Sequence, residues 1–303
     1  MKWTLLPLAF LGLNLTATPS KAAQVIRFDT MKAPGESSTA PFSFDESVNR
    51  APNFFSSQID ADLKAAPKGQ VSQLCAPASL AHIMAYEMGI KHGLPISTKV
   101  PGVASDLKSI DLNPLILDLG KRCKTDPKKG TTLANFVPCI TNAFQDYFGT
   151  NVPVTSIVKS PTPAAFPSSV KWRNEDPSLT DIREALKNGD PVLASVDWQK
   201  YDRATKKWTF IAGHIFVLYG YNWVSYWKDN TLSLNIMNPL TDPSNNDSVA
   251  DFDTVLAFKK SQDSSNDSIL LESSAGFDGA AARGFLRSLT ILHLPQGLAD
   301  RGR

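Results

Sequence analysis

The order of the apolar patterns along the chain constrains its fold more than any other feature. In the N-terminal half, apolar residues recur at helical spacing over residues 75–93, 106–119 and 133–148. In the C-terminal half they form short strand-like runs, at residues 192–196, 209–221, 232–237, 254–258, 268–271 and 289–294. Helices followed by consecutive strands, without an internal repeat, predict an α+β fold in which a helical half packs against a twisted antiparallel sheet.

Two helix starts are marked by residues that suit that position. Pro77 fits the first turn of the helix predicted at residues 75–93, because a first-turn residue needs no N–H for the helical ladder. Ser178 and Asp181 have the spacing of a capping box and predict a helix start in the second half. Gly189 is expected to end that helix.

The N-terminus has the features of a signal peptide. Lys2 supplies a positive charge, residues 4–15 are largely apolar, and small residues lead to a cleavage point after Ala22. The apolar run is too short for a spanning helix, so no membrane insertion is expected after cleavage and the protein is expected to be periplasmic or secreted. The predicted layout is a signal peptide, an extended arm or pro-like segment, and a main domain, at residues 1–22, 23–65 and 66–303.

Composition and charge narrow the classes of partner. Apolar residues make up 42% and charged residues 20% of the 303 residues, which is ordinary for a soluble globular protein with a core. Loss of Lys2 and Lys21 with the signal peptide reduces the formal net charge from +2 to zero. A neutral chain without a basic stripe argues against a nucleic-acid or anionic-membrane partner. The oligomeric state is not predicted.

The chain has three cysteines, and their spacing predicts one disulfide. Cys123 and Cys139 flank a short polar segment and are the natural pair in an oxidising compartment. Closing a loop of this size stabilises a fold by about 3 kcal/mol in the chain-entropy model. Cys75 is then left over, although three buried thiols or an intermolecular disulfide through Cys75 are alternatives.

Cys75 lies where a helix is predicted to begin. A helix N-terminus lowers the pKa of a thiol because its N–H groups and its macrodipole favour the anion, and the thiolate is the nucleophile. A glutamine shortly before Cys75 can donate its side-chain amide to a developing oxyanion. Gln70 and Gln73 both qualify, and Gln70 is preferred because five residues leave room for a turn.

A histidine and an asparagine in the second half complete a possible catalytic set. His214 stands at the entry to an apolar strand, where its ring can point into a cleft, although a core histidine is an equal alternative. His82 lies about 10.5 Å from Cys75 along a helix axis, too far for direct proton transfer, and His293 lies in a strand with a structural character. Asn238 follows another strand and can orient an imidazole, but Asn-Pro is also a common turn signal.

The order Cys, His, Asn, with about 140 residues between Cys75 and His214, fits papain-like enzymes. Gln70, Cys75-Ala-Pro-Ala-Ser79, Gly213-His214 and Asn238-Pro239 together resemble the bacteriocin-processing-peptidase-like (double-glycine peptidase-like) branch of the papain-like cysteine peptidases. The resemblance covers about residues 66–260. It implies a papain-like fold with a cleft between the halves, a peptide or protein substrate, and neither metal nor cofactor. It also implies Cys75 as nucleophile, His214 as base, Asn238 as the residue that orients the base, and Gln70 as oxyanion donor.

One departure from the family pattern affects the functional prediction. Ala76 stands where the family usually has glycine, and its methyl group could narrow the groove beside the nucleophile. The favoured prediction is a thiol hydrolase that cleaves an amide bond. The alternatives are a transglutaminase- or deamidase-type acyl transferase, and a catalytically silent papain-like module that binds peptide or cell-envelope polymer.

Overall fold

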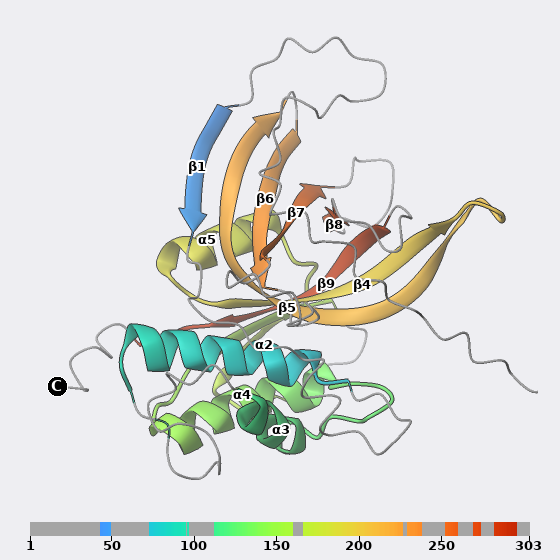
Figure 1. The fold of residues 1–303 in the computed structure, drawn as a ribbon. Helices are drawn as coiled ribbons and strands as arrows, with labels where there is room; N and C mark the ends of the chain where they lie inside the picture. The colour runs from blue at the N-terminus through green and yellow to red at the C-terminus, as the bar shows by residue number, and fades with distance from the viewer. Residues whose placement is uncertain are drawn as a thin grey trace, which may run out of the picture.

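The computed structural model describes residues 43–49, 73–94, 96, 112–159, 166–226, 229–237, 252–259, 269–273 and 282–295. The predicted signal peptide at residues 1–22 lies outside the described residues. Helices from the first half cover one side of a large sheet formed by the second half (Figure 1). This arrangement confirms the predicted α+β, papain-like fold. Within the described residues, no helix is long and apolar enough to cross a membrane.

The helices lie where the periodicity predicted them, with two changes in detail. The predicted helix 75–93 is an α-helix that continues as a π-helix, and the described part of the predicted helix 106–119 begins at residue 113. Ser178 caps its helix as predicted, with a bond of 3.1 Å from the Asp181 N–H to the Ser178 hydroxyl. The helices are α2 (Cys75–Ile83), η2 (Met84–Lys91), α3 (Asn113–Arg122), α4 (Leu133–Phe148) and α5 (Leu179–Asn188).

The strands form one sheet in which β4 pairs with both β5 and β9. All pairs are antiparallel except β2 with β3, so the prediction of an antiparallel sheet is wrong for that pair. Parallel strands require a crossover connection, and residues 159–169 separate β2 from β3 in the sequence. The strands are β1 (Ser43–Asn49), β2 (Val154–Val158), β3 (Val170–Arg173), β4 (Val192–Asp202), β5 (Lys207–Tyr226), β6 (Asp229–Met237), β7 (Phe252–Lys259), β8 (Ile269–Ser273) and β9 (Ala282–Leu292).

Two hydrophobic clusters lie on opposite faces of the central strands. The helix-side cluster contains the buried residues of α2, α3 and α4, and the α5-side cluster contains those of α5. Side chains alternate along a strand, so β5 contributes to both. Ile215, Val217 and Tyr219 belong to the helix-side cluster, whereas Phe216 and Leu218 belong to the α5-side cluster. Strand β5 therefore carries the contact between the two halves.

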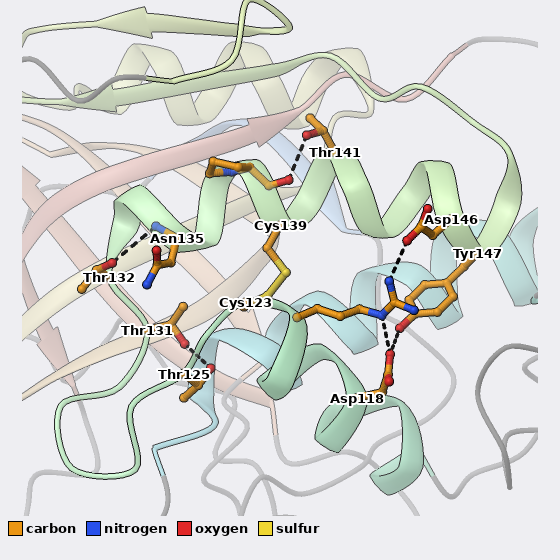
Figure 2. Close-up of a disulfide and its surroundings, with 12 residues drawn as sticks. Asp118, Cys123, Thr125, Thr131, Thr132, Asn135, Cys139, Thr141, Asp146 and Tyr147 are labelled. Atoms are coloured by element: carbon orange, nitrogen blue, oxygen red, sulfur yellow. Dashed lines mark hydrogen bonds and ion pairs between the residues drawn. A yellow bond between two sulfur atoms is a disulfide. The ribbon is translucent and has the colours of Figure 1, made fainter.

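The predicted disulfide between Cys123 and Cys139 is present, with Cα atoms 5.1 Å apart. Figure 2 shows that it joins the end of α3 to the middle of α4. The loop between the helices is closed a second time by a hydrogen bond of 2.7 Å between the hydroxyls of Thr125 and Thr131. The disulfide and this bond together hold the loop of residues 124–131 in one place.

A second set of contacts joins the last turns of α3 to the C-terminal end of α4 (Figure 2). Arg122 donates to Asp118 at 2.5 Å and to Asp146 at 2.6 Å. Tyr147 donates its hydroxyl to Asp118, and its burial and this bond raise the pKa of Tyr147 above the ordinary range. The two helices are thus fastened independently of the disulfide.

Removal of the disulfide is expected to destabilise the protein without unfolding it. The Cys123→Ser/Cys139→Ser double variant should lose about 3 kcal/mol of unfolding free energy, because the unfolded chain regains the freedom of the closed loop. Urea unfolding of this variant and of the wild type measures the difference, and wild type treated with a reductant is the control. A difference below about 1 kcal/mol would contradict this entropic role.

Candidate active site

Cys75 is the first residue of α2, as the sequence predicted. Leu74 precedes it as the cap residue, and the first helical bond runs from the Ala78 N–H to the Leu74 carbonyl at 2.9 Å. The Cys75 side chain is partly buried and lies outside the disulfide. The first N–H groups of an α-helix have no partner within the helix, and the macrodipole is positive at this end. The position therefore favours a thiolate over a thiol.

The residues on either side of Cys75 are fixed in the helix-side cluster. Ala76 is fully buried, so its methyl group faces the protein core and not a solvent-filled groove. The expected narrowing of the groove by Ala76 therefore has no support in the structure. Leu74 packs against α3, where a Cβ atom added to Gly120 would lie 2.7 Å from Leu74 Cδ2. The glycine thus permits the close approach of α3 to the start of α2.

His214 lies on β5, opposite Val196 of β4. It is 8% exposed, and its ring centroid lies 6.1 Å from that of Phe216, two residues along on the same face of the strand. The His214 side chain therefore lies on the same face of the sheet as Val196 and Phe216, which belong to the α5-side cluster. Its neighbour Ile215 points the other way, into the helix-side cluster.

Ser79 joins the cysteine helix to the histidine strand. Its buried hydroxyl donates a hydrogen bond of 3.1 Å to the carbonyl of Ile215, the residue after His214. Strand β6 pairs with β5 only from Val217 onwards, so this carbonyl lies in a stretch of β5 to which β6 does not extend. Ser79 was not among the residues for which the sequence predicted a role. A hydroxyl one turn after Cys75, within an otherwise apolar helix, is the signal that could have identified it.

Helix α2 and strand β5 run in the same direction where they pack together (Figure 1). Beyond the Ser79–Ile215 bond, a pocket is lined by His82, Ile83 and Tyr86 on the helical side and by residues 217–219 of β5. In the other direction, Cys75 lies about 6 Å before Ser79 along the helix axis. His214 lies one residue before Ile215, which corresponds to about 3.3 Å along a strand. Cys75 and His214 therefore lie within about 3 Å of each other's level along the packed helix and strand. The His214 side chain, however, shares the α5 face of the sheet with Val196 and Phe216, whereas α2 packs on the opposite face.

Two other histidines have positions that suit structural roles. His82 is fully buried in the last turn of α2. His293 follows β9, and its Nδ1 lies 2.8 Å from an oxygen of Asp190 while its Nε2 lies 2.8 Å from the Thr155 hydroxyl. Both ring nitrogens of His293 are thus engaged with side chains of neighbouring elements.

Gln70 and Asn238 lie outside the described residues. Asn238 directly follows Met237, the last residue of β6, which pairs with Val217 of β5. Gln73 is described, and a Cβ atom added to Gly130 would lie 3.5 Å from its Cβ. The loop of residues 124–131 therefore borders the segment that leads into Cys75.

The loop of residues 124–131 is also held by hydrogen bonds between its own residues. Asp126 accepts hydrogen bonds from the N–H groups of Lys128 at 2.8 Å and Lys129 at 2.9 Å. These two bonds lower the pKa of Asp126 below its usual value. Gly130 adopts a positive φ of 78°, which glycine tolerates without strain.

Comparison with known proteins gives one match. The model of the Peptidase_C39 like family matches residues 55–260, a span that includes helix α2 and strand β5. Neither the curated proteins nor the solved structures returned a match.

Proposed function

The chain belongs to the Peptidase_C39 like family, and from this premise we propose that it is an exported cysteine peptidase with Cys75 as nucleophile and His214 as base. The observation that carries this proposal is the Ser79–Ile215 hydrogen bond between the helix of the thiol and the strand of the imidazole. It holds the first turns of α2 beside the stretch of β5 that contains His214. The family supplies the reaction class, and its substrates are peptides or proteins.

The proposed reaction is transfer of an acyl group from an amide to water. The Cys75 thiolate attacks the carbonyl carbon, a carbon–sulfur bond forms, and the electron pair moves to the oxygen. When the intermediate collapses, the carbon–nitrogen bond breaks and the His214 imidazolium protonates the leaving amine. His214 then takes a proton from water, which attacks the thioester and releases the acid and the thiol.

Two further groups are proposed to support these steps. Asn238 orients the His214 ring by accepting a hydrogen bond from its far N–H, a role that its place directly after β6 supports. The backbone N–H of Cys75 and a glutamine side chain stabilise the oxyanion. Gln70 is the preferred glutamine, and Gln73 is the alternative.

Export is proposed from two independent features. Residues 1–22 have the charge and hydropathy pattern of a signal peptide. The disulfide between Cys123 and Cys139 suits an oxidising compartment such as a periplasm or the extracellular medium.

The pH dependence of Cys75 alkylation tests the proposed pair. Iodoacetamide should modify Cys75 of the protein lacking residues 1–22 well below pH 8.5, the ordinary pKa of a thiol, because a helix N-terminus and an imidazolium both stabilise the thiolate. His214→Gln should shift the alkylation profile to higher pH. Mass spectrometry of the Cys75 peptide gives the rate at each pH.

Because Cys123 and Cys139 are disulfide-bonded, they do not compete for the reagent. An unchanged profile in His214→Gln would count against the pair and favour the silent binding module. Transfer of a labelled amine to a peptide glutamine, measured in parallel, would instead indicate the acyl-transferase alternative.

A further inference from the structure

Strands β4 and β5 extend past the start of α2 as a long hairpin arm (Figure 1). Three aromatic side chains of the arm, Tyr201, Trp208 and Phe210, lie on one face. Together with Phe285 of the neighbouring β9 they form what we call the aromatic strip. Tyr201 and Trp208 are cross-strand partners with ring centroids 5.4 Å apart. Phe210 is 63% exposed, which is unusual for a large apolar side chain on an ordered strand.

The strip lies on the face of the sheet that packs against α2. Side chains alternate along a strand, so the odd-numbered residues of β4 share one face. Leu193 at one end of this row belongs to the helix-side cluster, and Tyr201 lies at the other end. Between them, Asp197 pairs with Phe285, and Gln199 pairs with Phe210.

The register places the strip on the side of the sheet where α2 and its first residue, Cys75, pack. Asp197 pairs with Gly213, the residue before His214, and the Asp197 carboxylate accepts a bond of 2.7 Å from Arg287. The strip thus begins one row beyond His214, whose own side chain lies on the opposite face of the sheet, and runs away from that row on the face of α2. From Gly213 to Trp208 the arm spans about 15 Å, the length of roughly four or five residues of an extended peptide.

The opposite face of the arm has a different character. Thr209 pairs with Lys200, and Lys207 pairs with Asp202, so this face is polar beyond Trp198. Beyond Trp198, the aromatic side chains of the arm lie on the face that packs against α2, and an exposed aromatic surface in that place indicates binding.

The tip of the arm carries positive charge. Arg203, Lys206 and Lys207 are exposed there. The acidic residue nearby, Asp202, accepts hydrogen bonds from the N–H groups of Ala204 at 2.9 Å and Thr205 at 3.4 Å. The tip therefore attracts anionic groups.

We propose that the aromatic strip binds the substrate polypeptide on one side of the bond that is cleaved. This inference rests on the proposed function and adds the class of substrate segment. The segment is extended and carries large apolar or aromatic side chains within about five residues of the cleaved bond, followed by acidic residues that meet the basic tip. Aromatic platforms of this kind concentrate binding energy in a few side chains.

Binding to a variant without the nucleophile tests the proposal separately from the chemistry. The probe is a fluorescein-labelled peptide with Phe and Leu residues followed by Glu residues, titrated with Cys75→Ala protein and followed by anisotropy. Phe210→Ser in this background should raise Kd about tenfold, which corresponds to about 1.4 kcal/mol. Thr209→Ala, on the neighbouring residue that faces the other way, is the matched control and should change Kd less than twofold.

Two altered peptides check the chemistry of the segment. Replacing Phe and Leu with Ser should abolish measurable binding, and replacing Glu with Lys should weaken binding more at low salt than at high salt. Equal Kd values for Phe210→Ser and Thr209→Ala, or no binding of the first peptide, would overturn the proposal. Wild-type turnover of a short fluorogenic amide, too short to reach the strip, reports the proposed function independently.

Discussion

Cys75→Ala should abolish peptide hydrolysis while leaving the fold intact. Without the sulfur no thioester forms, and loss of a nucleophile of this type lowers kcat by about 10³-fold or more. The thermal midpoint should change little, because Cys75 is only partly buried, forms no disulfide and is the first residue of its helix. Hydrolysis of an unfolded protein such as reduced casein, followed by mass spectrometry of the fragments, gives the rate.

Cys75→Ser is the matched variant, since it keeps the size of the side chain and replaces sulfur with a poorer nucleophile. It should lose nearly as much activity as Cys75→Ala. Circular dichroism and the thermal midpoint of both variants establish that they are folded. Turnover by Cys75→Ala at more than about a tenth of the wild-type rate would exclude Cys75 as the nucleophile.

Substitution of two histidines should separate chemistry from stability. His214→Gln should lower kcat/KM by about 10²- to 10⁴-fold, the usual contribution of a general base and acid. His293→Ala should leave kcat/KM within a few-fold of wild type and lower the unfolding free energy by about 1–3 kcal/mol. The reason is that His293 bonds both Asp190 and Thr155, so its loss leaves buried polar groups to find other partners.

Steady-state kinetics and urea unfolding of both variants decide between the roles. Equal losses of activity in the two variants would indicate a general effect on folding. Preserved activity in folded His214→Gln would remove His214 from the mechanism.

The amino-acid sequence alone predicted most of the secondary structure, because local patterns decide it. The helix at residues 133–148 has the observed bounds, since its apolar periodicity is uninterrupted in spite of Pro138. The capping box at Ser178 is an interaction between residues three apart and is readable without tertiary information. The disulfide was also predictable, because the odd number of cysteines and the short segment between two of them favoured one pair.

The predictions were weaker wherever distant segments decide the outcome. The lengths of β4 and β5 were underestimated, since each strand continues into the arm through cross-strand pairing rather than through its own apolar run. The parallel pair of β2 and β3 was missed because register between strands leaves little trace in either strand. Gln70 and Asn238 were chosen from motif and spacing, and their roles stay predictions.

The sequence by itself determined two residues of the proposed site, a cysteine at a helix start and a histidine in an apolar strand, although the strand begins at Lys207 and His214 lies inside it rather than at its entry. Each of these is a local property of a few neighbouring residues. Only the tertiary structure decided that the start of α2 packs beside the stretch of β5 that contains His214, with the His214 side chain on the opposite face of the sheet, because the bond from Ser79 to Ile215 joins positions 136 residues apart. It also decided that the Ala76 methyl group is buried in the core, since burial depends on the neighbours that packing brings together.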